Sequence, residues 1–505
     1  MVNHLHYADD ILVFGEASIS NANSLQIALS SFAKYSGLVL NNAKCQFIFS
    51  HNTPLANEIC AQLGFSQTEN TILYLGIPIS TKKLKASHFQ PLLSKLFTLL
   101  AGWKVKFLSF AGRVQFLKFT IVNTIAYWIR GAVIPKGVGR QIDKLCSKFL
   151  FHGTHSGKKL HLIAWNKTCL PKCFGGLGLP SLDSLSFAFG CSFLWRFYTT
   201  SSLVGDWFRH KFSSPWKPLK PKTSNFWKRI VSIALKIKDK LNFHVISENC
   251  TLSMWWDPWC QGNTVLDAAQ SICLTGVVSD FISNGFWSLP SQLDQSVCTR
   301  ITATPIFAHP HSQISWAGSF KPSFKDYYMG FYSELNLVPW FKFVWHAHYA
   351  LKYASYAWMA LLDGLKTVDV LAKRNIYLPP ECSLCRIEDE STAHCFFQCE
   401  FSFSVISTLL PSLNSFLLRP NLHQIFQYFD GVETLKGFEK NFCYFVICCT
   451  LYHLWRERNG RRFGELETSG QDYLKKIIYA IKAKTGNWKQ VDRIKDAFPN
   501  CFLGY

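Results

Sequence analysis

Two adjacent carboxylates near the start of the sequence are the first residues whose types and spacing suit chemistry. Asp9 and Asp10 follow an alternating run with Leu5 and Tyr7, and a β-branched and aromatic run, residues 11–14, follows them. This pattern predicts a tight hairpin with the acids at its tip. Paired carboxylates repel each other unless a hard cation such as Mg²⁺ lies between them, and phosphoryl transfer uses such a site. The alternative is an ordinary solvated Asp-Asp turn.

A second set of potential ligands lies in the stretch CSLCRIEDESTAHCFFQC, residues 382–399. Cys382, Cys385, His394 and Cys399 form the spacing C-x2-C-x8-H-x4-C. Two close pairs of thiolate and imidazole ligands are typical of a tetrahedral Zn²⁺ site, and without a free ligand position the site is expected to be structural. The acidic residues 388–390 are predicted to form an exposed loop between the two pairs. The alternative is a group of reduced, buried side chains without metal.

The charge of the chain favours an anionic partner. Lys and Arg outnumber Asp and Glu by 53 to 32, which gives a net charge of +21, and aromatic residues make up 15%. Cations that neutralise phosphates and rings that stack on bases are typical of nucleic-acid binding. The densest basic cluster is WRERNGRRF, which contains Arg456, Arg458, Arg461 and Arg462. It is predicted to contact phosphate, although a solvated helix end has the same pattern.

The elements that must position these groups are mostly helical after residue 80. Apolar residues recur at spacings of three and four, which predicts helices over 88–101, 108–129, 182–198, 403–430 and 437–456. The segment 276–325 shows no sustained period and is predicted to be a connection with short strands. The Trp-rich stretch around Asp257 is interpreted as a packed turn capped by that carboxylate. The expected fold class is α+β, mostly α.

Composition and length limit the cellular context. A chain of 505 residues with 48% hydrophobic residues can bury several cores. Its 18 cysteines are scattered and no apolar leader is evident, which indicates a reducing, intracellular location in the nucleus or cytoplasm rather than secretion. The longest apolar stretch, residues 442–455, is shorter than the ~20 residues needed to span a bilayer, so we expect a buried helix and no membrane partner.

Several motifs together resemble the reverse transcriptases of plant non-LTR (LINE-type) retrotransposons. The sequence YADD at 7–10 resembles their catalytic hairpin, SGLVLNNAK at 36–44 resembles the segment that follows it, and YLGIP at 74–78 resembles a later turn of the palm. Trp103-Lys104, residues 108–113 and GGLG at 175–178 match segments that accompany plant members. The Cys and His motif, with the preceding Trp345 and Trp358, resembles their zinc-binding region, although Cys395 replaces a usually apolar residue and leaves the fourth ligand open.

The resemblance implies that the chain is divided into regions with different functions. It implies a partial palm at 1–80, a helical thumb or connection at 81–212, a linker and Trp-rich connection at 213–335, a zinc-binding domain at 336–410 and a basic helical region at 411–505. In the palm, Asp9 and Asp10 would hold Mg²⁺ for RNA-directed DNA synthesis from dNTPs. RNA and DNA would be the partners of the thumb and zinc-binding modules. The residues expected to contact them, besides the four arginines, are Lys44, Lys104, Arg113 and Lys118.

The family's two-metal site requires a third carboxylate, which its members supply from a strand upstream of the hairpin. The sequence here begins just before the hairpin, so we expect a fragment of the polymerase that is inactive alone. Three hypotheses follow. The chain is an active polymerase completed by Glu16, Glu58 or another chain; or a zinc-dependent nucleic-acid-binding remnant without chemistry, which we favour; or a degenerate gene product without function.

Overall fold

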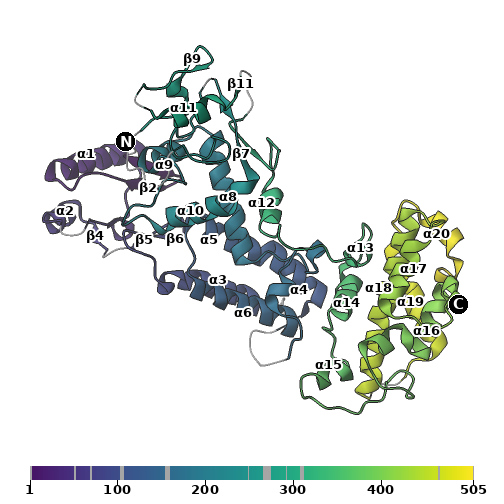
Figure 1. The fold of residues 1–505 in the computed structure, drawn as a ribbon. Coiled ribbons are helices and arrows are strands. Elements are labelled where there is room, and N and C mark those ends of the chain that lie inside the picture. The colour runs from purple at the N-terminus through teal and green to yellow at the C-terminus, as the bar shows by residue number, and fades with distance from the viewer. Residues whose placement is uncertain are drawn as a thin grey trace. The chain divides into compact units, whose positions relative to one another are not determined.

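The computed structural model describes residues 3–50, 53–68, 71–102, 107–153, 160–247, 249–265, 275–291, 293–307, 312–464 and 467–503. The chain divides into two compact units, each built from several segments. Unit 1 comprises Met1–Lys95, Thr124–Arg140 and Asp183–Phe331, and unit 2 comprises Leu96–Asn123, Gln141–Leu182 and Tyr332–Tyr505. Figure 1 shows the helices and strands along the chain. Each unit is described by itself.

The N-terminal part of unit 1 is built from small two-stranded sheets and two helices. The strands pair as β1 with β2, β3 with β4 and β5 with β6. The turn between β5 and β6 needs two residues with positive φ, and Leu75 and Gly76 adopt 51° and 75°. The elements are β1 His4–Tyr7, β2 Asp10–Val13, α1 Ile19–Ser36, η1 Asn42–Lys44, β3 Gln46–Phe47, α2 Ala56–Leu63, β4 Ser66–Gln67, β5 Thr71–Tyr74, β6 Ile77–Ser80 and η2 Ala86–Phe89.

The rest of unit 1 surrounds a core rich in aromatic residues. Trp227 and Trp255 are almost fully buried there, with α8 and α10 supplying much of the apolar surface. Gly190 of α8 lies close to Ile233 of α10, and a Cβ at this position would require the Ile233 side chain to move. The elements are α8 Leu182–Thr199, α9 Leu203–Phe212, α10 Asn225–Lys236, η6 Lys238–Lys240, β7 Leu241–Phe243, β8 Val245–Ile246, η7 Val278–Phe281, β9 Ile282–Ser283, β10 Phe286–Trp287, α11 Gln295–Thr302, β11 Ile306–Phe307, β12 Ile314–Trp316 and α12 Phe324–Gly330.

Unit 2 is helical and is centred on its longest helix, α18 Gly437–Arg462, which packs against α14 Leu351–Leu361 and α19 Gly470–Thr485. Four described helices have residues in both units: α3 Gln90–Ala101, α5 Val122–Gly131, α6 Lys136–His152, and α8, whose first residue Leu182 belongs to unit 2. The other elements of unit 2 are α4 Phe110–Phe116, the π-helical turn η4 Leu117–Ile121, α7 Trp165–Thr168, η5 Lys172–Phe174, α13 Phe341–Val344, α15 Val368–Ala372, η8 His394–Gln398, α16 Glu400–Leu409, η9 Pro411–Ser415, α17 Leu422–Gly431, α20 Val491–Ala497 and η10 Pro499–Cys501.

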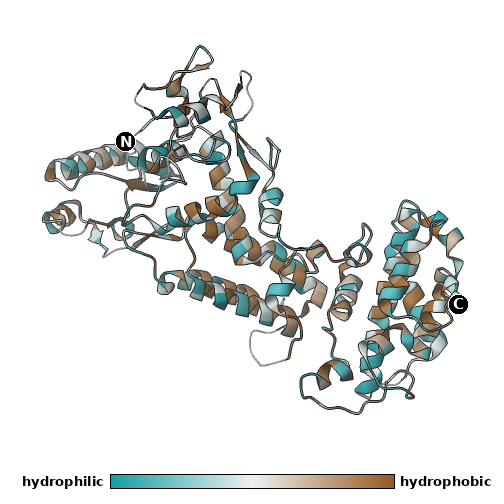
Figure 2. Cartoon of the chain, in the orientation of Figure 1, coloured by the Kyte–Doolittle hydropathy of each residue, from teal (hydrophilic) through white to brown (hydrophobic). Residues whose placement is uncertain are grey.

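The fold class predicted from the sequence is confirmed, because the described chain is mostly helical with a few small sheets. Most helices carry both apolar and polar residues, brown and teal in Figure 2, as amphipathic helices do. The apolar stretch 442–455 lies within α18 and is buried as expected. The single helix expected over 403–430 is wrong, because α16 ends at Leu409 before Pro411 and α17 begins only after Pro420. No described helix is long and apolar enough to cross a membrane.

Candidate metal centre

The first pair of cysteines lies at the tip of a narrow loop. An isolated bridge joins Glu381 to Asp389, and the backbone N–H of Cys382 donates to the carbonyl of Glu388 at 2.8 Å. The N–H of Arg386 donates to the carbonyl of Cys382, and Arg386 has a φ of 59°, so the chain reverses directly after Cys385. These local hydrogen bonds bring both sulfur atoms to one side of the loop.

The second pair lies at the two ends of a tight π-helical turn. His394 begins η8, and Cys399 follows it as the N-cap of α16, with its N–H donating to the carbonyl of His394 at 2.8 Å. Phe397 adopts a φ of 90°, which is strained for a non-glycine residue, and its N–H donates to the hydroxyl of Ser402. Burial of the Phe397 ring in the core keeps the turn in place.

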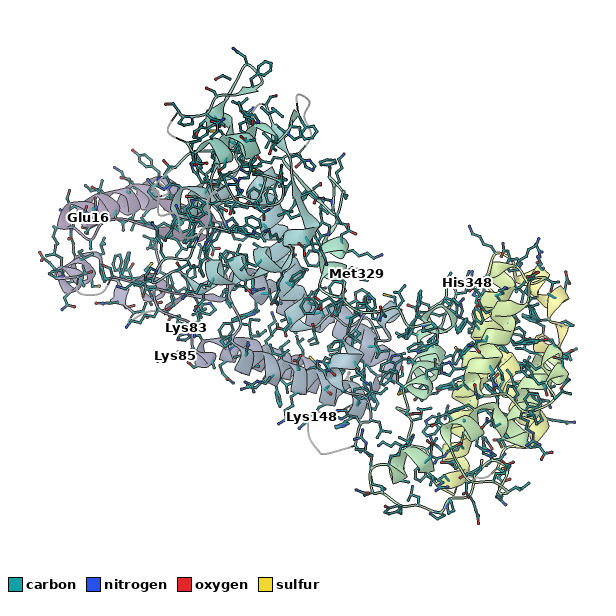
Figure 3. The ribbon with its side chains drawn as sticks, in the orientation of Figure 1. Glu16, Lys83, Lys85, Lys148, Met329 and His348 are labelled. Carbon is teal, nitrogen blue, oxygen red and sulfur yellow. The ribbon has the colours of Figure 1, made fainter. Side chains whose placement is uncertain are left out.

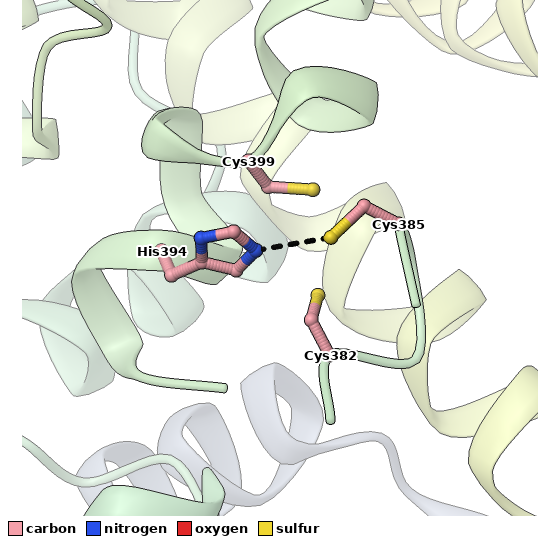
Figure 4. Close-up of side chains that lie close together, drawn as sticks. All are labelled: Cys382, Cys385, His394 and Cys399. Carbon is pink, nitrogen blue, oxygen red and sulfur yellow. Dashed lines mark hydrogen bonds between the residues drawn. The ribbon is translucent and has the colours of Figure 1, made fainter. Parts of the chain in front are cut away.

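The structure brings the four predicted ligands of the two pairs together. Their ligand atoms all lie within 4.8 Å of one another. Cys385 Sγ lies 3.3 Å from His394 Nε2, and a dashed line marks this contact in Figure 4. In a tetrahedral site with Zn–S bonds of about 2.3 Å, ligand atoms are separated by roughly 3.5–3.8 Å. The cluster therefore fits a four-coordinate zinc ion after small side-chain adjustments. Three of the four residues are buried, and Cys385 is half-buried.

A carboxylate orients the imidazole for metal binding. His394 Nδ1 lies 3.3 Å from Oε2 of Glu388, on the side of the ring away from Cys385. A histidine that donates its Nδ1 proton to a carboxylate presents the lone pair of Nε2 to a metal, and such outer partners raise metal affinity. The spacing of the ligands does not indicate this role, because Glu388 lies in the acidic run predicted only to be an exposed loop.

The electrostatics of the sulfur atoms favour a cation. Hydrogen bonds from Cys395 and Cys399 hold the pKa of the Cys382 thiol far below its usual range, whereas the contact with Cys382 and burial raise the pKa of Cys399. One thiolate thus suppresses ionisation of its neighbour. Because Zn²⁺ neutralises several thiolates at once, a bound zinc ion removes this conflict. Cys395 contacts Cys382 but lies outside the four-residue group, which leaves Cys399 as the fourth ligand that the geometry favours.

Three of the four arginines expected to contact nucleic acid have other partners. The guanidinium of Arg458 is buried against the carboxylate of Glu390, with Nε 2.8 Å from Oε2. Arg461 donates to the carbonyl of Leu384, and Arg462 donates to the carbonyls of Pro379 and Glu381. Burial of Arg458 contradicts its predicted contact with nucleic acid, whereas the predicted contacts of Arg461 and Arg462, which are partly exposed, stay predictions.

The predicted exposed loop at 388–390 also needs a correction. Glu388 and Asp389 are exposed, but Glu390 is buried, and its carboxylate accepts hydrogen bonds from Arg458 and from the N–H of Val368 at the start of α15. A buried carboxylate needs such donors because desolvation otherwise makes its charged form too costly.

The carboxylate hairpin at the N-terminus forms as predicted. Tyr7 pairs with Asp10, and Ala8 and Asp9 form the turn, with Ala8 at a φ of 52°. Both aspartates are exposed, and within the described residues the Cys and His group is the one cluster of three or more metal-ligand side chains, so no third carboxylate joins them. Glu16, labelled in Figure 3, is exposed as well. The catalytic and Mg²⁺ roles of Asp9 and Asp10 stay predictions.

The other predicted nucleic-acid contacts differ in exposure. Lys44 and Lys118 are exposed, whereas Lys104 lies outside the described residues. Arg113 is half-buried and donates from Nε to the carbonyl of Leu108 and from Nη1 to that of Leu150, each at 3.1 Å. Two of its three nitrogen groups are thus used inside unit 2, which favours a structural role at the C-terminal end of α6 over the predicted phosphate contact.

Arg456 remains exposed and has basic neighbours that the sequence analysis missed. Burial and the positive charges of Lys352, Arg456 and Lys476 lower the pKa of His453 to about 4. Lys352 also lies 4.8 Å from the ring centre of Tyr452. These cations come from α14, α18 and α19. The sequence gives no sign of the grouping, because these helices are far apart along the chain.

The geometry defines a helical protein with a Cys3His site of the structural zinc class, and two protein families match the chain. Residues 1–79 match the family described as reverse transcriptase (RNA-dependent DNA polymerase). Residues 323–405 match a second family, described as zinc-binding in reverse transcriptase, and this segment contains the whole Cys and His cluster. A protein of Arabidopsis thaliana with the name putative ribonuclease H protein is 22% identical over 445 residues, which covers 81% of this chain and 70% of the relative.

These matches confirm the resemblance at the level of a plant retrotransposon-type reverse transcriptase, whereas the LINE-type assignment stays a prediction. The chain contains reverse transcriptase and zinc-binding sequence of the plant retrotransposon type, in the order that the motifs predicted. Nucleic-acid binding by such a protein and zinc binding by its Cys3His cluster follow from the same matches.

Proposed function

We propose that this chain is the zinc-binding and nucleic-acid-binding part of a LINE-type retrotransposon reverse transcriptase and has no polymerase activity by itself. The observation that carries this proposal is the cluster of Cys382, Cys385, His394 and Cys399 within 4.8 Å, inside a segment that matches the zinc-binding region of reverse transcriptases. When bound, zinc supplies a structural cross-link between the cysteine loop and the start of α16.

The proposed ligand of the protein is the phosphate backbone of element RNA or target DNA. The net charge of +21 supplies long-range attraction, and exposed cations such as Lys118 and Arg456 supply contacts. Lys352 and Lys476 add positive charge beside Arg456, and the exposed residues Lys83 and Lys85, labelled in Figure 3, add more in unit 1. Binding that depends on phosphate neutralisation weakens as salt rises.

The first experiment measures zinc content and nucleic-acid binding of the full chain together. We expect one zinc ion per chain and binding to a labelled RNA–DNA duplex that weakens steeply between 50 and 200 mM salt. The double variant Cys382→Ser with Cys385→Ser should lose the metal and bind the duplex more weakly. Cys173→Ser is the matched control, because Cys173 is a half-buried thiol of unit 2 outside the cluster. A wild-type chain that binds no zinc at micromolar concentration contradicts the proposal.

A second candidate is a working polymerase completed by residues outside this chain. The observation in its favour is the hairpin, which presents Asp9 in the turn and Asp10 beside it, both exposed to a partner or to Mg²⁺. It requires a third carboxylate from Glu16, Glu58 or another chain. Primer extension with Mg²⁺ and dNTPs that disappears in Asp9→Ala supports this candidate, and extension that is unchanged in Asp9→Ala eliminates it.

The third alternative is a degenerate gene product without retained function. Detection of a stable zinc-loaded protein in cells argues against it, and failure to detect any protein favours it. We propose an intracellular location in the nucleus or cytoplasm, supported by the free thiols of all the described cysteines. Fractionation of cells that express the chain tests this location.

A further inference from the structure

The loop between the two ligand pairs carries a buried ion pair that zinc coordination does not use. Glu390 lies four residues before His394, and its carboxylate accepts hydrogen bonds from Nε and Nη2 of Arg458 on α18. Both side chains are almost completely buried, and the N–H of Val368 also donates to Glu390, at 3.0 Å. A two-pronged contact between a guanidinium and a carboxylate fixes both distance and orientation. The ligand loop is thereby attached to one side chain of α18.

Two further arginines on the same face of α18 hold the cysteine end of the loop. Arg461 Nη1 donates to the carbonyl of Leu384, between the two cysteines, at 3.0 Å. Arg462 donates to the carbonyls of Pro379 at 2.8 Å and Glu381 at 3.2 Å, directly before Cys382. The backbone carbonyls on both sides of Cys382 therefore have guanidinium donors from α18.

The loop also reaches past the end of α18. Arg386, directly after Cys385, forms an ion pair with Glu467 in the connection between α18 and α19. Arg461 lies 3.8 Å from the same carboxylate and 3.0 Å from that of Glu457. These contacts join the zinc-ligand loop, α18 and the following connection in one charged network.

We propose that Arg458, Arg461 and Arg462 are positioning residues that hold the ligand loop in its metal-binding conformation. The zinc-binding module therefore extends through α18 to Glu467. This inference rests on the proposed zinc site and adds residues that touch no metal. The zinc-binding family match ends at residue 405, and the domain predicted from the sequence ends at residue 410, so both end before α18. If the module includes α18, loss of the contacts between its arginines and the ligand loop lowers zinc affinity even though all four metal ligands remain.

The experiment compares variants of the full chain at two arginines of α18. Arg458→Met removes the guanidinium, whereas Arg456→Met is the matched control, because Arg456 is exposed and lies two residues away on the same helix. Zinc affinity is measured by competition with a coloured chelator, and Co²⁺ spectra report the ligand geometry. We expect Arg458→Met to lose at least about tenfold in affinity, as for other residues that support metal ligands, and Arg456→Met to stay within about twofold.

A double variant separates positioning from simple burial of charge. Glu390→Leu with Arg458→Met leaves no unpaired charge, so thermal stability should partly recover while zinc affinity stays reduced. Hydrogen exchange of the zinc-free proteins is the second measurement. The N–H of Arg386 and Glu390, which donate to Cys382 and Pro380, should exchange slowly in the wild-type chain and faster in both Arg458 variants.

Arg462→Lys leaves both side chains of the buried pair in place and keeps a positive charge near Glu390, whose carboxylate lies 4.0 Å from Nη1 of Arg462. It keeps the positive charge but loses the forked contact with two carbonyls, and we expect a loss in zinc affinity of about threefold or more with circular dichroism unchanged. Wild-type affinity and an unchanged Co²⁺ spectrum in both Arg458→Met and Arg462→Lys overturn the inference. A wild-type chain without zinc overturns the proposed function itself, so the two failures are distinguishable.

Discussion

The buried carboxylate of Asp257 in unit 1 leads to a prediction of how stability depends on pH. Its Oδ1 accepts hydrogen bonds from the hydroxyls of Tyr198 at 2.7 Å and Ser214 at 2.5 Å, and its Oδ2 accepts one from the N–H of Ser253 at 2.7 Å. Complete burial nevertheless raises the pKa of Asp257 from 3.8 to about 6. Desolvation thus outweighs the three hydrogen bonds, and the folded protein binds this proton more tightly than the unfolded chain.

The sign and size of the effect follow from this difference. Because the folded pKa is above the unfolded pKa, the contribution to stability is fully present below about pH 4 and is lost as the pH rises through 6. A shift of roughly two pKa units corresponds to roughly 3 kcal/mol. Asp257→Asn places a neutral amide in the same space. Its oxygen can accept from Ser253, and its NH2 group can donate to the hydroxyls of Tyr198 and Ser214.

The assay is urea unfolding at pH 4.5, 6 and 8, followed by the fluorescence of the buried Trp255 and its neighbours. We expect the free energy of unfolding of Asp257→Asn, relative to that of wild type, to increase by about 2 kcal/mol between pH 4.5 and 8, so that the variant gains stability relative to wild type as the pH rises. Taking the difference removes the titration of all other groups. Asp257→Ala is the control, and it should be destabilised at every pH because three donors lose their acceptor. A difference between Asn and wild type that is constant with pH refutes the argument.

Three further predictions concern the metal centre and the cations of unit 2. Glu388→Gln should lower zinc affinity by about tenfold, measured by chelator competition, because the amide holds His394 less firmly; unchanged affinity would show that Glu388 does not orient the ring. Removal of zinc by a chelator should lower the melting temperature of the wild-type chain but not of Cys382→Ser, and an equal shift in both would mean that the chelator acts elsewhere. Lys118→Gln should reduce the slope of log affinity for duplex against log salt by up to about 0.9, whereas Arg113→Met should leave the slope unchanged and lower the melting temperature, since only Lys118 is exposed; equal slopes for both variants contradict this distinction.

Local patterns in the sequence predicted local structure well. The alternation around Asp9 predicts a hairpin, and the structure pairs Tyr7 with Asp10. The interpretation of the Trp-rich stretch as a turn capped by Asp257 is confirmed by the hydrogen bond from the N–H of Ser253. In both cases the decisive interactions join residues fewer than five positions apart, so that spacing alone carries the information.

Contacts between segments that are far apart along the chain could not be predicted from local spacing. Glu390 and Arg458 are 68 positions apart, and nothing in the sequence around either residue indicates that the other is its partner. The sequence does, however, indicate which arginine side chains of α18 face the core. Leu451, Leu454 and Arg458 follow one another at spacings of three and four, so Arg458 continues the buried face of α18, whereas Arg456 falls on another face. Charge density indicated a surface, but helical phase indicates burial.

The two candidate metal sites differ in what holds their ligands. The Cys and His cluster lies in unit 2 between buried residues, and arginines of α18 fix the loop that carries two of its ligands. Asp9 and Asp10 lie on a two-stranded hairpin whose β1 residues are all exposed. A two-stranded hairpin is only marginally stable without a further strand or helix against it, and a two-metal site requires carboxylates held within about 0.5 Å. The hairpin therefore needs a partner surface before its aspartates can act in catalysis, whereas the zinc site has its supports within unit 2.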